Sequence, residues 1–98
     1  MPVGMLLEIP GATSEQYDAL NREMDMTQQT LPDGLVSHVA GEGDGTFVIF
    51  DVWVSREAFE GFVQERLMPV MHRLMGDQAQ QFRPRFVEIH NEFHGRVH

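Results

Sequence analysis

Two neighbouring stretches of the chain carry an imidazole and a carboxylate, which are suited to moving a proton, together with an indole. His38 lies in the apolar stretch 35–40, and Asp51 and Trp53 lie in the stretch 46–54, which is rich in β-branched and aromatic residues typical of strands. An imidazole changes its charge near neutral pH, and a nearby carboxylate tunes it. We therefore take His38 and Asp51 as a candidate general-base pair and Trp53 as a candidate pocket wall.

The spacing of these residues places them on one face of a predicted antiparallel hairpin. With Gly41 opposite Thr46, His38 and Asp51 become diagonal neighbours, about 7–8 Å apart. A slip of one residue would move them to opposite faces. Their face also carries Val36, Ala40, Phe47, Ile49 and Trp53, and the other face is almost wholly apolar, with Leu35, Ser37, Val39, Val48, Phe50, Val52 and Val54. Phe47 and Trp53 are the candidates for holding an aromatic substrate.

Each of these residues also has a plainer interpretation. A charged Asp51 between apolar residues costs free energy to bury unless it is paired, which favours a polar pocket. It could instead end the strand, cap the following helix or face solvent. His38 could be a structural histidine on a half-buried face. Trp53 could fill the core.

Two amphipathic segments are predicted to cover the hairpin. Apolar residues from Tyr17 to Leu31 recur at helical spacing and predict a helix over 14–30. Ser55 is a candidate N-cap for a longer helix that continues to Met75, and Gly76 is a plausible stop. Pro69 removes a backbone donor inside that helix, so a kink near Met68 is expected.

Four side chains on these helices are further site candidates. Arg66 projects toward the apolar stripe beside Phe62, where it either snorkels outward or points its guanidinium into a cavity as an oxyanion stabiliser. Phe62 is a candidate for substrate contact. His72 faces solvent on an unkinked wheel, but the kink could turn it inward. The Tyr17 hydroxyl could reach the same cavity or pack in the core.

The order of elements predicts an α+β fold. Strands over 3–9, 35–40, 46–54 and 81–93 alternate with the two helices as βαββαβ, a ferredoxin-like sandwich that forms a single domain over residues 1–98. Pro84 in the last strand favours an edge or a bulge. The sheet face without helices would be bare and apolar, so we expect a second copy to cover it in a homodimer.

The composition of the chain argues against some classes of binding partner. The net charge of −8 argues against nucleic acid and against an anionic membrane surface. The chain has no cysteine, no signal peptide and no apolar run of membrane-spanning length, so we expect a cytoplasmic protein. His90, His94 and His98 would suit a metal only on a helix, and their stretch reads as strand and tail. No phosphate loop or nucleophile elbow is present. We expect neither a metal nor a cofactor.

Three runs carry a resemblance to a known group of proteins. They are IPGATSEQYD at 9–18, PDGLVSHVA at 32–40 and DVWVSREAFEGF at 51–62. Together they resemble the dimeric α+β barrel superfamily, and within it small actinobacterial proteins related to the antibiotic biosynthesis monooxygenase domain. The resemblance implies a homodimer whose two sheets face each other, with a pocket between sheet and helices in each subunit. Haem-degrading members use an asparagine on the first strand, which this chain lacks between Val3 and Ile9.

The resemblance and the candidate site together lead to three hypotheses of function. The first is a cofactor-independent enzyme that deprotonates a hydrophobic aromatic or polyketide-like small molecule and then oxygenates, cyclises or isomerises it. The second is a non-catalytic dimer that binds such a molecule. The third is a structural or accessory dimer without a ligand. Fold alone does not choose among them.

Overall fold

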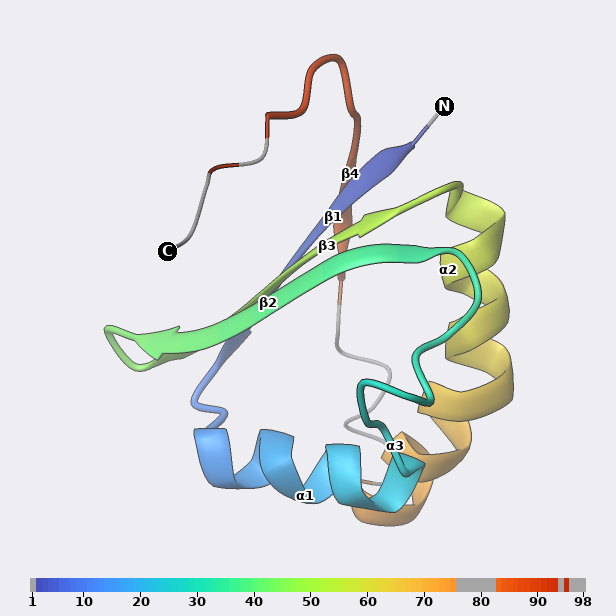
Figure 1. Ribbon diagram of the computed structural model, residues 1–98. Helices are drawn as coiled ribbons and strands as arrows, with labels where there is room; N and C mark the ends of the chain where they lie inside the picture. Colours follow the sequence, from blue (N-terminus) through green and yellow to red (C-terminus); the bar gives the residue numbers. More distant parts are fainter. Residues whose placement is uncertain (1, 76–82, 94, 96–98) are drawn as a thin grey trace.

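The computed structural model describes residues 2–75, 83–93 and 95 as one sheet with helices against one face (Figure 1). The strands are β1 (Val3–Pro10), β2 (Leu35–Gly43), β3 (Thr46–Trp53) and β4 (Arg85–Glu88). The helices are α1 (Ser14–Met24) and the continuous run α2 (Arg56–Phe62), η1 (Val63–Leu67) and α3 (Met68–Met75). The predicted βαββαβ order is confirmed.

All strand pairs are antiparallel, in the order β2-β3-β1-β4. Strand β3 lies between β1 and β2, which is the split arrangement of a ferredoxin-like α+β fold. Strand β4 lies at an edge, as the proline before it predicted. Within the described residues it spans only 85–88, with Pro84 outside it, so the predicted strand over 81–93 was too long; positions 81 and 82 lie outside the described residues.

The hairpin of β2 and β3 differs from the predicted register by two residues. Gly43, rather than Gly41, pairs with Thr46, because β2 extends three residues further than expected. A shift of two keeps the side chains of the regular part of the hairpin, from Ser37 onward, on their predicted faces. It places His38 directly opposite Asp51, where the prediction had them as diagonal neighbours.

A bulge at the start of β2 changes the face of two side chains. Leu35 pairs with Trp53 and Ser37 with Val52, so Val36 is the extra residue. Leu35 consequently packs against the core beneath the helices, and Val36 is left half exposed. The predicted faces of Leu35 and Val36 were therefore wrong, because a regular alternation does not anticipate a bulge.

Helix α1 ends six residues before its predicted end at Thr30. Asp25 takes a left-handed conformation with φ of 54°, which closes the helix. The chain then turns through a hydrogen-bonded segment in which the Thr30 hydroxyl donates to the Asp25 carbonyl at 2.6 Å. At the end of this connection Gly34 has a φ of +88°, and a Cβ there would lie 2.7 Å from that of Ala58. The periodic Thr27 and Leu31 thus belong to a loop.

The second helical run begins at Ser55, whose hydroxyl accepts the Ala58 N–H, so the predicted N-cap is confirmed. The predicted irregularity takes the form of one π-helical segment, η1, just before Pro69. Its closing bond runs from the Met68 N–H to the Val63 carbonyl, five residues back. A π-turn accommodates the missing proline donor without breaking the helix. Gly76, the predicted stop, lies outside the described residues.

The two faces of the sheet are unlike. The face under the helices buries Met5, Phe47 and Trp53, with Phe59 closing over them from α2. The opposite face leaves Val39, Phe50 and Val87 at 66%, 40% and 57% exposure. Gly4 lies among these, where its missing side chain leaves room for the Phe50 ring. The predicted bare apolar face is present.

Candidate active site

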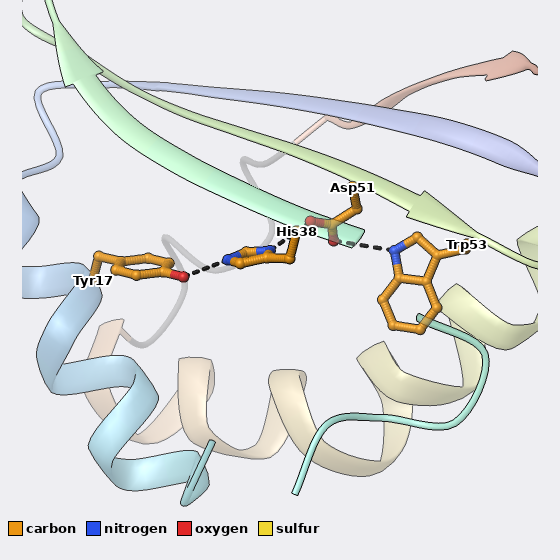
Figure 2. Close-up of polar contacts among 4 residues, drawn as sticks. All are labelled: Tyr17, His38, Asp51 and Trp53. Carbon is orange, nitrogen blue, oxygen red and sulfur yellow. Dashed lines mark hydrogen bonds and ion pairs between the residues drawn. The ribbon is translucent and has the colours of Figure 1, made fainter. Parts of the chain in front are cut away.

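Asp51 is the charged side chain that the sheet buries. It is 5% exposed, and both of its oxygens have partners. Oδ1 lies 2.5 Å from Nδ1 of His38, and Oδ2 accepts the Trp53 indole N–H at 3.1 Å. Figure 2 shows these groups in one row under the hairpin. A buried carboxylate is tolerated when it is paired in this way.

The pairing with Asp51 sets the tautomer of His38. A carboxylate that accepts from Nδ1–H leaves Nε2 of a neutral imidazole as an acceptor. On that side the ring meets the Tyr17 hydroxyl from α1, in a hydrogen bond shown as a dashed line in Figure 2. The result is a chain of contacts from Tyr17 through His38 and Asp51 to Trp53. His38 remains 34% exposed by side chain, so the chain also reaches the surface.

An apolar cavity of about 410 Å³ lies between the sheet and the helices. This volume suits a small organic ligand. Tyr17 and Phe47 line it, with ring centroids 4.9 Å apart. His38, Asp51 and Trp53 are not among the lining residues. The others that line it are Leu7, Ile9, Ala12, Thr13, Gln16, Ala19, Leu20, Ile49, Phe59, Val63, Leu67, Met68, Met71, Leu74 and Pro84.

Arg66 does not join this group, contrary to the grouping made from sequence. Its guanidinium donates to the carbonyls of Thr30 at 2.7 Å and Met24 at 3.1 Å. The Met24 carbonyl is at the end of α1, where helix carbonyls lack partners within the helix, and the Thr30 carbonyl lies in the connection to β2. Arg66 therefore fastens the α1–β2 connection to η1. Neither a position on the helix wheel nor snorkelling anticipated these acceptors.

Two other candidates, Phe62 and His72, have no hydrogen bond to the chain of contacts from Tyr17 to Trp53. Phe62 packs against Trp53, with ring centroids 5.5 Å apart, and lines a second cavity together with Arg66. That cavity, about 510 Å³, is bounded by the α1–β2 connection and by α2 and η1. His72 is exposed on α3, because Val70 and Met71 take the buried positions beside it. The alternative in which a kink turns His72 inward is therefore wrong.

Sequence reasoning missed the contact between Tyr17 and His38 and most of the cavity wall. Phe59, Met71 and Leu20 have the spacing of core residues, and nothing in that spacing marks a cavity. The apolar stripes of the two helices contain residues that line the cavity, but they did not predict that a cavity lies between those residues.

No helix in the described part of the chain has the length and apolar character needed to cross a bilayer. Within the same part, no three histidine, cysteine or acidic side chains gather as a metal ion would require. Of the histidines considered for a metal, His90 is exposed, and His94 and His98 lie outside the described residues.

Three solved structures have a fold similar to that of this chain. A Chloroflexus aurantiacus protein assigned to the antibiotic biosynthesis monooxygenases is 16% identical, with a TM-score of 0.62 over 97% of this chain and 98% of its own. SnoaB, a cofactor-independent oxygenase from Streptomyces nogalater, is 14% identical, with a TM-score of 0.62 over 93% and 95%. MhuD, solved with two manganese protoporphyrin IX molecules per active site, is 11% identical, with a TM-score of 0.57 over 97% and 100%.

No protein-family profile and no curated protein sequence matches the chain. The structural matches show that it has the ferredoxin-like α+β fold that these antibiotic biosynthesis monooxygenase and oxygenase structures also have. The resemblance drawn from sequence is confirmed at the level of fold. Its narrowing to actinobacterial proteins stays a prediction.

Proposed function

We propose that the chain is a cofactor-independent enzyme that removes a proton from a hydrophobic, aromatic or polyketide-like small molecule. The observation that carries the proposal is the His38–Asp51 pair, which meets the apolar cavity through Tyr17. Asp51 orients the imidazole, and Nε2, the nitrogen on the Tyr17 side, accepts the proton. The carbanion or enolate that remains is the reactive species.

Phe47 and Phe59 supply aromatic walls for a flat ring system. Trp53 supports this wall from behind, since its ring lies 5.5 Å from Phe59, and it also holds Asp51 in place. The sequence assigned Trp53 and Phe62 to direct substrate contact. Their positions favour a supporting role, in which a change to either would move the wall.

Two outcomes follow from the deprotonated intermediate. With dioxygen as second substrate, an activated methylene is oxidised to a carbonyl while dioxygen is reduced; one oxygen atom stays on the carbon and the other leaves as water. Without dioxygen, the same intermediate cyclises or isomerises. The fold similarity to SnoaB, itself a cofactor-independent oxygenase, favours the first outcome.

A haem-type activity fits the residues less well. MhuD holds manganese protoporphyrin IX, and a porphyrin iron is commonly held by histidine or cysteine. The described residues that line the cavity include neither, and His72 on α3 is exposed. We therefore derive no step through haem.

The active form we propose is a homodimer formed through the outer face of the sheet. Val39 and Phe50 are a cross-strand pair on that face, and both are exposed. Pairing two such faces would remove this apolar surface from water. Sedimentation should show a dimer for the native chain and a monomer for the double variant Val39→Asp/Phe50→Asp. A monomeric native chain would contradict the proposed homodimer.

Anthrone, a three-ring ketone with an activated methylene, is a suitable test compound. His38→Ala should lower its aerobic oxidation by about 100-fold or more, the usual size of a general-base contribution. His72→Ala is the matched control, since it removes an exposed histidine from the same chain. Native turnover by His38→Ala, with anthrone binding intact, would discard the base assignment.

The second candidate function is binding without catalysis. The apolar lining of the cavity favours it, because such a lining needs no acid–base pair. Trp53 is the chain's single tryptophan, so its fluorescence reports on ligand in the adjacent cavity. Binding of anthrone without any conversion by the native protein, and equal binding by His38→Ala, would support this function over the first.

A further inference from the structure

Tyr17 separates His38 from the apolar cavity. The tyrosine ring lines the cavity, while His38 and Asp51 are absent from its wall. The Tyr17 hydroxyl is hydrogen-bonded to Nε2 of His38, the nitrogen that the Asp51 contact leaves as acceptor. A molecule inside the cavity would therefore contact Tyr17 before it reached the imidazole.

Tyr17 also differs from the other polar groups of the cavity wall. The described lining contains Thr13 and Gln16 besides Tyr17. Those two are bonded to each other's backbone as the capping box of α1: the Thr13 hydroxyl accepts the Gln16 N–H, and the Gln16 side chain accepts the Thr13 N–H. Their side-chain oxygens are thus committed to holding the helix. The Tyr17 hydroxyl is the lining group that is bonded to a titratable side chain.

We propose that Tyr17 is the catalytic residue that touches the substrate, and that His38 and Asp51 act through it. This inference rests on the proposed function. It assigns removal of the substrate proton to the Tyr17 oxygen instead of Nε2 of His38. The substrate proton passes to the Tyr17 oxygen as the Tyr17 proton passes to Nε2 of His38. The bond electrons stay on the substrate, and the imidazolium that forms lies beside the Asp51 carboxylate.

The surroundings of the three groups suit this transfer. Asp51 is buried and fixed by Trp53, so it is placed to stabilise a positive imidazole without moving. His38 is one-third exposed, which gives the proton a route from the dry cavity to water. The Tyr17 and His38 rings are nearly parallel, with 9° between their planes, and the nearby Phe47 ring packs against Tyr17. The hydrogen bond to His38 at the hydroxyl end and the packing of Phe47 against the ring limit rotation of the phenol.

The geometry also narrows the substrate class. Thr13, Gln16 and Tyr17 come from the start of α1, and the other lining side chains within the described residues are apolar. A ligand would place its acidic C–H or phenolic O–H at that polar end and its rings against the apolar remainder. The fitting class is a neutral polycyclic compound with one acidic position near an edge, rather than a charged acid.

The test is the exchange of anthrone methylene protons in D₂O under nitrogen, followed by NMR. Tyr17→Phe keeps the ring and removes the hydroxyl, and His38→Gln keeps an acceptor for that hydroxyl but cannot take its proton. Both variants should lose about 100-fold or more of the enzyme-catalysed exchange rate. Anthrone should still quench Trp53 fluorescence in both, which shows that they fold and bind.

The outcomes separate this inference from the proposed function. If Tyr17→Phe keeps the rate and His38→Gln loses it, His38 acts directly, and only the assignment to Tyr17 is overturned. If Tyr17→Phe loses the rate and His38→Gln keeps it, the relay is overturned. If both keep the rate, the proposed function fails as well.

A second measurement distinguishes chemistry from structural support. The chain has a single tyrosine, so incorporating 3-fluorotyrosine alters Tyr17 alone. The fluorinated phenol is more acidic and almost the same size. If the phenol takes part in the transfer, the limb of the pH dependence of exchange at high pH, where the phenol loses its proton, should move to lower pH. A profile that stays in place would contradict the proposal.

Discussion

Two cavities lined by described residues differ in what their polar groups are bonded to. One, against α2 and η1, carries the charged residues Asp33, Glu57, Glu65 and Arg66 in its wall. Its arginine donates to backbone carbonyls and so holds a loop. The other, between the sheet, α1 and α3, is almost apolar but ends in a tyrosine bonded to a histidine–aspartate pair. The number of charges is thus a poor guide to chemistry here, and the partners of each charge are a better one.

The largest effect expected from this difference is at Asp51. Asp51→Asn keeps the size and an acceptor oxygen, but it removes the negative charge that stabilises a protonated His38. Exchange of anthrone protons should fall by about 100-fold, and the free energy of unfolding should drop by about 1–3 kcal/mol. Deuterium exchange measures the rate of proton removal from anthrone, and urea unfolding measures the free energy of unfolding. An unchanged rate would mean that the pair only supports the fold.

A smaller effect on stability, with none on chemistry, is expected at Arg66. Arg66→Met keeps the length of the side chain and removes both bonds to the α1–β2 connection. The free energy of unfolding should fall by about 1–3 kcal/mol, because two carbonyls lose a charged donor. The rate of anthrone exchange should be the same as that of the native chain. A large loss of rate at native stability would restore Arg66 to the site.

The smallest effect is expected at Thr30, which lies in the α1–β2 connection that Arg66 also holds. Its hydroxyl donates to the Asp25 carbonyl and accepts the Thr27 N–H at 2.8 Å. Thr30→Val keeps the shape and loses these bonds, which should cost about 1 kcal/mol of unfolding free energy. Combined with Arg66→Met, the two costs should not add, because both act on one loop. Additive costs would show that the two side chains act independently.

Sequence reasoning predicted the fold better than the site. Alternation along 46–54 and the helical stripes gave the topology, and a two-residue error in the hairpin left His38 and Asp51 on one face. It failed where a partner lies far away in the chain. The acceptors of Arg66 are 36 and 42 residues away, and the Tyr17–His38 bond depends on how α1 lies against the sheet. Periodicity carries no information on either.

The tautomer of His38 is the property on which the proposed chemistry depends most directly. Long-range proton–nitrogen NMR of the ¹⁵N-histidine protein, with His38→Gln to assign the signal, reports which ring nitrogen carries the hydrogen in the neutral form. The contact with Asp51 predicts the hydrogen on Nδ1 and an acceptor at Nε2. A hydrogen on Nε2 would contradict it, because the imidazole would then have no free site for a proton from Tyr17.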